Sequence, residues 1–404
     1  MKFTHFTPFE YVLINLANHF GLDKKEYDYR INFMKTNMDN LESMVEDADE
    51  PELFYKNVLE LRKMQAGKPV GTLVSFDSVC SGIQILSALT RCKLGAVATG
   101  LINTGNRPNA YLMVQLEMER IMGREIEVTY KDIKQAVMTS CYGSQAVPKA
   151  LFEGRALDAF HEACQLVAPG AFNMLPVLRD TWDPQTKVHE WYLPDGYKAF
   201  VPVMDSTVVR IEIDELEGYK MSTLMTENVC LDKGLANIAN IVHSLDAFVL
   251  RCLVRYCSYD TEAVIRKRAA VMKELANRDT EDYQPNMEDL FHHVNSMQWV
   301  DITLLDTVKL KDIPSDMLQA LASDLERMLK HKSFEVVPVH DCFSCHPNNM
   351  DVLRMWYNEI LARMSESTIL AWILGQMYDD PSTTLELFPE PIGDLIRQAN
   401  YAIC

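Results

Sequence analysis

The sequence predicts a helix-rich α+β fold in which a few short strands interrupt a mainly helical chain. Residues 73–76 form a short apolar run that ends abruptly in Asp77, and residues 334–339 form a second apolar run that Asp341 follows closely. Residues 237–254 repeat apolar side chains every three or four positions, which is typical of a helix that buries one face. Both acids are therefore expected at the exposed ends of buried strands.

Composition limits the class of protein. The chain has 404 residues, of which 48% are apolar, so it can bury a large core, which we expect to form two or three lobes of one catalytic body. No run approaches the roughly 20 apolar residues of a membrane span, and the N-terminal segment lacks the flanks and cleavage site of a signal peptide. We therefore expect a soluble intracellular protein with reduced cysteines. The net charge of −18 argues against a general DNA-coating protein, because phosphate binding depends on Lys and Arg.

Helices and turns can be placed along the first part of the chain. A helix is expected over 3–20 and a second from near Tyr29, whereas residues 36–60 are rich in acids and are expected to form a solvated face or loop. A further helix over 111–121 should end at Gly123, because glycine readily adopts the left-handed conformation that ends many helices.

Two β-hairpins and a long helical region are expected further on. Residues 190–203 contain a Pro-Asp-Gly turn, which is typical of a hairpin. Alternation over 207–213 predicts a strand of a second hairpin that reaches about Val229. Residues 257–332 are expected to be helical and acidic overall, and we assign no chemistry to them.

The two acids at strand ends are candidate metal ligands. A strand fixes the direction of such a carboxylate, and the edge of the sheet leaves coordination positions open. Two acids placed in this way can share a pair of Mg²⁺ ions, one activating a hydroxyl nucleophile and the other stabilising a leaving pyrophosphate. For Asp77 considered alone, the alternative that it caps the following helix stays open.

Residues 128–152 form a second candidate region. In a helix, Lys134, Met138 and Tyr142 lie at i, i+4 and i+8 on one side, with Lys131 a turn earlier. Eight residues rise about 12 Å, which is close to the length of an extended nucleoside triphosphate. Gly143 would let a base approach the backbone closely. An ordinary amphipathic helix with solvated lysines has the same spacing.

A competing motif overlaps the second strand. Cys342, Cys345 and His346 match CxxCH, the attachment pattern of a c-type haem. Haem attachment requires an exported chain, and this chain has no export signal. A zinc site is disfavoured because no second ligand pair has the right spacing. We therefore interpret the motif as a coincidence.

Four stretches, in this order, resemble the motifs of the single-subunit RNA polymerases of phages and mitochondria. They are DSVCSGIQILSA at 77–88, KQAVMTSCYGS at 134–144, NIVHSLD at 240–246 and VHD at 339–341. The segments GLDKKEYDYRINF and WYLPDG are similar to further segments of that family, so most of the chain is covered. The chain also resembles the larger chain of the split, two-polypeptide RNA polymerase of N-four-like podophages.

The resemblance implies a right-hand polymerase fold with palm and fingers. Residues 1–100 would form the first part of the palm, and 101–230 the fingers, including the nucleotide-binding helix 131–144 and the hairpins. Residues 231–404 would form the second part of the palm, with a helical insertion at about 257–332, the Asp341 hairpin and a C-terminal tail beside the site. The N-terminal promoter domain and the thumb would be lacking.

The resemblance also implies residue roles. Asp77, Asp341 and the backbone carbonyl of Ser78 would hold two Mg²⁺ ions. The implied catalytic residues are Asp77, Asp341, Lys134, Tyr142 and His243, and the implied substrate-binding residues are Lys24, Arg30, Lys131, Lys134, Tyr142, Gly143 and Tyr111. In particular, Lys24 and Arg30 would lie near the phosphate exit. Lys131 is assigned because Tyr130 stands where the family has a second phosphate-binding arginine.

Departures from the family pattern imply partners. The Asp-x-x-Gly-Arg element of the family is not found in this sequence. We therefore expect a smaller subunit that supplies the N-terminal and thumb parts, besides DNA template, RNA product and NTPs. A single-stranded-DNA-binding recruiting factor, the absence of membrane association and the cytoplasm of an infected bacterium as location are further expectations. The alternatives are a palm-family DNA polymerase and a non-catalytic scaffold subunit.

Overall fold

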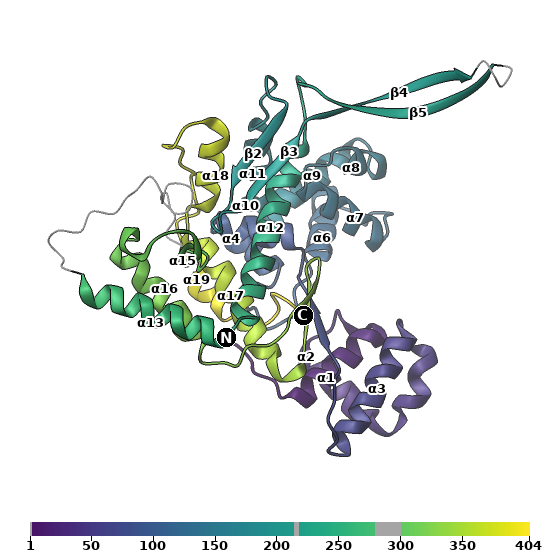
Figure 1. Cartoon of the computed structure of the whole chain (residues 1–404). Helices are drawn as coiled ribbons and strands as arrows, with labels where there is room; N and C mark the ends of the chain where they lie inside the picture. Colours follow the sequence, from purple (N-terminus) through teal and green to yellow (C-terminus); the bar gives the residue numbers. More distant parts are fainter. Residues whose placement is uncertain (1, 214–217, 279–299) are drawn as a thin grey trace.

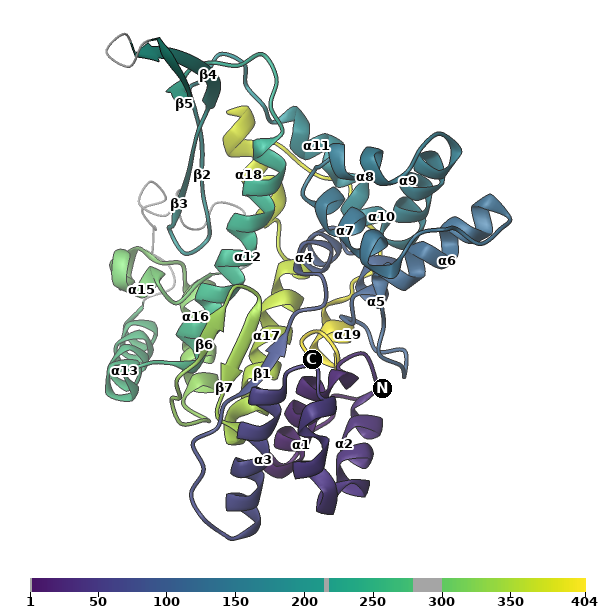
Figure 2. The same ribbon diagram turned by 90° about the vertical axis from the view of Figure 1, so that its right-hand side faces the viewer.

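A three-stranded antiparallel sheet lies near the centre of the molecule (Figure 1; Figure 2). The computed structural model describes residues 2–213, 218–278 and 300–404. The strand order is β1–β7–β6, formed by β1 (Val74–Asp77), β7 (Cys342–Cys345) and β6 (Val337–Val339). Asp77 pairs with Cys342, so strands more than 250 residues apart in the sequence meet at the end that carries the predicted acids.

Three helices pack together beside this sheet. They are α4 (Ser81–Leu89), α12 (Ala236–Cys257) and α17 (Met350–Glu366), and each contacts the other two. All nine residues of α4 are buried, which makes it the central element of the core. By length and composition α12 resembles a membrane span, contrary to the expectation that no segment does, but half of its most apolar window is buried inside the protein. A helix of a protein core buries one face in this way.

The N-terminal helices form a group at one end of the sheet (Figure 2). They are α1 (Pro8–Ala17), the π-helical turn η1 (Asn18–Leu22), α2 (Tyr27–Thr36), the 3₁₀ helix η2 (Met38–Asp47) and α3 (Pro51–Gln65). The helix expected over 3–20 begins later, at Pro8, because Thr7 and Glu10 form a capping box there. The acidic stretch 36–60 is helical rather than a loop, since η2 and α3 bury apolar side chains and leave most acids exposed.

A second helical group follows α4 in the chain. It comprises α5 (Lys93–Ala98), α6 (Ala110–Met122), α7 (Tyr130–Cys141), α8 (Ala146–Leu151), α9 (Arg155–Val167), α10 (Pro169–Phe172) and α11 (Met174–Asp180). The predicted end of α6 at Gly123 is confirmed: the glycine adopts φ +70° and its N–H donates to the carbonyl of Glu119.

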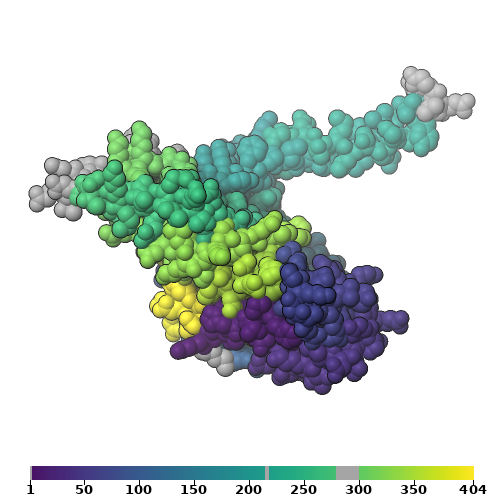
Figure 3. Space-filling view, turned by 60° about the horizontal axis from the view of Figure 1, so that its bottom comes forward, coloured from purple at the N-terminus to yellow at the C-terminus, as the bar shows by residue number. Residues whose placement is uncertain are grey.

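Both expected hairpins are present. The first pairs β2 (Val188–Tyr192) with β3 (Lys198–Pro202), and the second pairs β4 (Met204–Ile213) with β5 (Tyr219–Asn228). The second hairpin projects from the body as a two-stranded arm (Figure 1; Figure 3). Most of its side chains are exposed, including large apolar ones such as Val208 and Leu224.

Removal of this arm should barely change the stability of the body. The N–H of Val229 donates to the carbonyl of Val203 at 3.2 Å, so an Asn-Gly turn could join these residues in place of 204–228. Because an isolated two-stranded ribbon is at best marginally stable, we expect the free energy of unfolding to change by less than about 1 kcal/mol. Urea unfolding of both chains measures this change. A loss of several kcal/mol would show that the arm supports the body.

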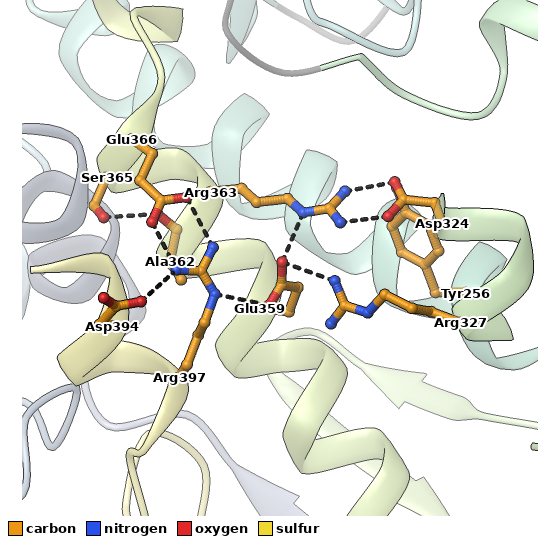
Figure 4. Close-up of polar contacts among 10 residues, drawn as sticks. All are labelled: Tyr256, Asp324, Arg327, Glu359, Ala362, Arg363, Ser365, Glu366, Asp394 and Arg397. Carbon is orange, nitrogen blue, oxygen red and sulfur yellow. Dashed lines mark hydrogen bonds and ion pairs between the residues drawn. The ribbon is translucent and has the colours of Figure 1, made fainter. Parts of the chain in front are cut away.

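The remaining elements belong to the part of the chain that follows α12. They are α13 (Thr261–Asn277), α15 (Leu304–Thr307), η4 (Leu310–Asp312), α16 (Ser315–Met328), η5 (Pro347–Asn349), α18 (Ile369–Tyr378) and α19 (Gly393–Arg397). Where it is described, the region expected to be helical over 257–332 is mainly helical; residues 279–299 of it lie outside the described residues. Ion pairs link α16, α17 and α19 around Glu359 (Figure 4).

Arg354 ties the two ends of the chain together. Its buried guanidinium donates to the carbonyls of Thr4 and Asn400 and to the hydroxyl of Tyr11. It also lies over aromatic rings of the N-terminal segment, at 4.5 Å from the ring centroid of Phe3. These contacts satisfy a buried charge and hold the last residues against α17.

Candidate active site

Asp77 and Asp341, 264 positions apart in sequence, lie side by side. Asp77 is the last residue of β1, and Asp341 lies in the turn between β6 and β7, where His340 adopts φ +56°. The N–H of Ser78 donates to the carbonyl of Asp341 at 3.0 Å, and its hydroxyl donates to the Asp341 carboxylate at 2.7 Å. Asp77 does not cap α4, because the residue at that cap is Cys80 in a left-handed conformation. The capping alternative is therefore wrong.

The two carboxyl groups repel each other. Although solvent reaches Asp77, the surrounding protein raises its pKa to about 6, first by burial and then by the charge of Asp341, with which it also shares a hydrogen bond. Lys134 acts in the opposite direction. A divalent cation between the carboxylates would relieve this repulsion, and oxygen ligands of this kind suit Mg²⁺.

Both acids open into one pocket with a volume of about 200 Å³. We call it the Asp77 pocket. It is lined by residues from the first loop, β1, the loop before α6, α7 and the C-terminal tail: besides the acids, they include Asp23, Lys24, Ser78, Ser81, Arg107, Tyr111, Tyr130, Lys134, Met138, Tyr142 and Cys404. Cations and acids are thus gathered in one recess, as a site for a metal and an anionic ligand requires.

Helix α7 supplies one wall of the pocket. It begins with a capping box between Thr129 and Asp132, which fixes its direction. Lys134, Met138 and Tyr142 all line the pocket, so the predicted spacing places them on one face. The Lys134 ammonium lies 5.9 Å from the ring centroid of Tyr111, and its charge acts on Asp77. One end of the wall is therefore cationic, and Tyr142 forms the other end.

The comparisons with known proteins give matches to RNA polymerases. Residues 6–163 match the model of the family described as DNA-dependent RNA polymerase. A probable DNA-directed RNA polymerase from Gelasinospora sp. (strain G114) is 21% identical over 349 residues, which is 83% of this chain and 39% of the relative. Over these residues the chain is similar to single-subunit DNA-dependent RNA polymerases.

A second relative is the mitochondrial DNA-directed RNA polymerase 1B of Nicotiana tabacum. It is 24% identical over 239 residues, which is 49% of this chain and 24% of the relative. The chain thus spans less than half the length of either relative.

Several of the predicted site residues line the Asp77 pocket. They are Lys24, Ser78, Tyr111, Lys134 and Tyr142, together with the two acids. Lys24 is paired there with the neighbouring Asp23. The pocket therefore unites residues from five separate stretches of the sequence.

Arg30, predicted to lie near the phosphate exit and to bind substrate, does not line the pocket. The side chain is fully buried and donates to the carbonyls of Lys25 and Asp23 and to the amide oxygen of Asn18. It therefore shapes the loop that carries Lys24, instead of presenting its charge to a ligand.

Lys131 and Gly143 are also absent from the pocket lining. Lys131 is exposed on α7, whereas its neighbour Tyr130 does line the pocket. Gly143 adopts φ +87°, and a Cβ there would come within 2.7 Å of Ile238 on α12. The glycine is thus required by helix packing, which corrects the predicted role of an opening for a base.

His243 lies behind Tyr142. The two rings pack with centroids 4.6 Å apart, and burial lowers the pKa of the imidazole. His243 is not among the pocket-lining residues, so in this structure it supports Tyr142 from α12.

The sequence analysis gave no role to Asp246, which lies one turn after His243. Its carboxylate accepts a hydrogen bond from Ser81 at 3.3 Å, and its pKa is raised to about 6 by burial and by the charges of Asp341 and Asp77. The spacing from His243 was the available signal, because residues at i and i+3 share a helix face.

The C-terminal tail packs against the end of β1, beside Asp77. The N–H of Cys404 donates to the carbonyl of Asp77 at 2.9 Å, and the N–H of Val79 donates to the carbonyl of Ala402. Tyr401 stacks on Tyr27 with ring centroids 4.7 Å apart. The tail thus forms part of the pocket, as the resemblance implied.

The residues of the CxxCH motif form part of the fold: Cys342 and Cys345 lie in β7, and His346 follows them. Burial raises the pKa of Cys342 to about 11 and of Cys345 to about 12, which disfavours the thiolates that a metal would bind. The His346 ring contacts the Val70 carbonyl and accepts from the N–H of Asn348. Among the described residues, no group of three or more His, Cys, Asp or Glu side chains is arranged to hold a metal.

Proposed function

We propose that this chain is the catalytic part of a DNA-dependent RNA polymerase that adds NTPs to an RNA 3′ end by template-directed nucleotidyl transfer. The observation that carries the proposal is the convergence of Asp77, Asp341 and Lys134 in one pocket. The match of residues 6–163 to the family model and the names of both relatives support it.

Two Mg²⁺ ions would be held by Asp77, Asp341 and the carbonyl of Ser78. When bound, they would lower the pKa of the attacking hydroxyl and stabilise the charge on the leaving pyrophosphate. The donor set fits this role, because both carboxylates face one recess and Ser78 fixes the Asp341 carboxylate by a hydrogen bond. The pocket contains three acids, Asp23, Asp77 and Asp341, of which Asp23 is paired with Lys24.

The chain's own residues would hold the nucleotide. Lys134 would neutralise charge on the triphosphate, since its ammonium stands opposite the metal-ligand acids. Tyr142 would contact the ribose, and His243 would maintain the position of the Tyr142 ring. Lys24 would meet the leaving pyrophosphate after exchanging its partner Asp23.

In this proposal residues 1–100 and 231–404 form a palm and residues 101–230 the fingers, with about 257–332 as an insertion. We also propose a phage origin, action in the cytoplasm of the infected bacterium, and a heterodimer with a smaller subunit that supplies N-terminal and thumb parts. The net charge of −18 supports a partner, because a cationic surface is needed to hold nucleic acid. A single-stranded-DNA-binding recruiting factor is part of the same proposal.

Primer extension tests the proposal. We expect the purified chain, mixed with the protein that co-purifies with it, to extend an RNA primer on a DNA template with Mg²⁺ and NTPs. Extension should be at least about tenfold faster with NTPs than with dNTPs, because a site built to hydrogen-bond a hydroxyl rejects the analogue that lacks it.

Two outcomes would contradict the proposal. Faster extension with dNTPs would favour a DNA polymerase of the related palm family. No extension with either set, with or without the partner, would favour a scaffold subunit.

A further inference from the structure

Arg107 is a pocket residue that belongs to none of the predicted motifs. It lies in the loop before α6 and lines the same recess as Asp77 and Lys134. Its Nε is buried and has no hydrogen-bond partner among the described residues, and its Nη1 reaches the Pro108 carbonyl only at 3.5 Å. Buried polar groups are usually satisfied, so an unused donor in a pocket indicates a place for a ligand.

The other cations of the pocket are already engaged. Three cationic side chains line it: Lys24, Arg107 and Lys134. Lys24 is paired with Asp23, and Lys134 acts on Asp77. Arg107 itself interacts with Cys404: burial lowers its pKa, but the charge of Cys404, a hydrogen bond with it and the charge of Asp23 outweigh burial and raise the pKa, so the guanidinium stays charged while its Nε has no partner among the described residues.

We propose that Arg107 binds the triphosphate of the incoming nucleotide as a second cation beside Lys134. This inference rests on the proposed function and adds a specific substrate-binding residue to it. A guanidinium presents a planar set of donors that matches two phosphate oxygens at once. Lys131, the residue that the sequence offered for this task, is exposed and does not line the pocket.

The position of Arg107 favours a nucleotide over a nucleic-acid strand. Its side chain is partly buried in the recess that holds the metal-ligand acids, whereas a strand is tracked by cations on open surface. The triphosphate is the anionic group that must approach those acids during the proposed reaction.

Steady-state primer extension with Arg107→Gln and Arg107→Lys tests this inference. We expect Arg107→Gln to raise the KM for NTPs about 10- to 100-fold, which corresponds to loss of charged hydrogen bonds. Arg107→Lys should recover part of that loss. Affinity for a fluorescent RNA–DNA scaffold should stay within about twofold of wild type. Arg124→Gln, which removes an exposed arginine outside the pocket lining, is the matched control and should leave both values unchanged.

Binding of 2′(3′)-O-methylanthraniloyl-ATP with Mg²⁺ separates this inference from the proposed function. If wild type binds the probe but extends no primer, the polymerase proposal fails while the role of Arg107 in triphosphate binding is still decided by the variant. Unchanged probe affinity in folded Arg107→Gln, with circular dichroism as the test of folding, would overturn the inference. So would a rise in KM for Lys131→Gln without one for Arg107→Gln, or a loss confined to scaffold binding. If Arg107→Gln does not fold, probe affinity of Arg107→Lys decides: wild-type affinity counts against a bidentate contact.

Discussion

Replacing Asp77 or Asp341 by asparagine is expected to reduce RNA synthesis by at least about 10³-fold, or roughly 4 kcal/mol of transition-state stabilisation. Asparagine has nearly the same shape as aspartate, so the fold should persist, but it supplies one neutral oxygen in place of a charged carboxylate. Primer extension at saturating NTP and Mg²⁺ measures the effect. Asp47→Asn is the matched control, because Asp47 is an exposed acid at the end of η2.

The same substitution should stabilise the metal-free protein. Asp77 has a folded pKa of about 6 against an ordinary value of 3.8, so its protonated form favours the folded state. That contribution is fully present below about pH 4 and is lost as the pH rises through about 6. Asparagine is neutral at every pH, so Asp77→Asn should raise the Tm above pH 7 in EDTA and leave it unchanged near pH 4. Synthesis at the wild-type rate, or a lower Tm at pH 8, would count against a strained pair of acids.

Local pattern was sufficient to predict the parts of the site that strands and helices carry directly. A strand that ends in an acid predicts where that carboxylate lies, so Asp77 and Asp341 could be placed at strand ends from sequence. The spacing along α7 likewise placed Lys134, Met138 and Tyr142 on one face, as the pocket lining shows. That both strands pair in one sheet was not contained in either pattern, because the pairing joins segments more than 250 residues apart.

Tertiary packing determines the positions of the residues that the sequence patterns did not place correctly. Arg30 and Lys24 belong to one basic stretch, yet the fold buries the first and leaves the second at the pocket. Arg107 gave no signal because it lies in a loop, where periodicity carries no information. Gly143 is required beside Ile238, nearly 100 residues away, because a Cβ there would come within 2.7 Å of that side chain. In each case the deciding neighbour is distant in the sequence.

Loss of the Glu359 charge should destabilise the protein by about 3 kcal/mol, because removal of one partner leaves buried charges uncompensated. Glu359 accepts hydrogen bonds or ion pairs from Arg327, Arg363 and Arg397 at 2.9–3.0 Å (Figure 4). Burial raises its pKa, but the hydrogen bonds from Arg327 and Arg397 outweigh burial and lower it to about 2. The stabilisation is therefore present above about pH 4.5 and is lost as the pH falls toward 2. Urea unfolding of Glu359→Gln at pH 7 and pH 3 measures it, with the larger difference from wild type expected at pH 7.

Glu366→Gln is the matched control, because Glu366 pairs with the same Arg397 but is 44% exposed. Exposed pairs contribute about 0–1 kcal/mol, so the control should lose much less. Helix α17 also connects Glu359 to the candidate active site, because the buried hydroxyl of Tyr357 on this helix donates to Gln84 of α4 at 2.9 Å. Because α4 follows directly on the Asp77 strand, Glu359→Gln should also shift the temperature at which RNA synthesis is lost to a lower value. Equal destabilisation by both variants would show that burial of Glu359 does not determine the strength of this network.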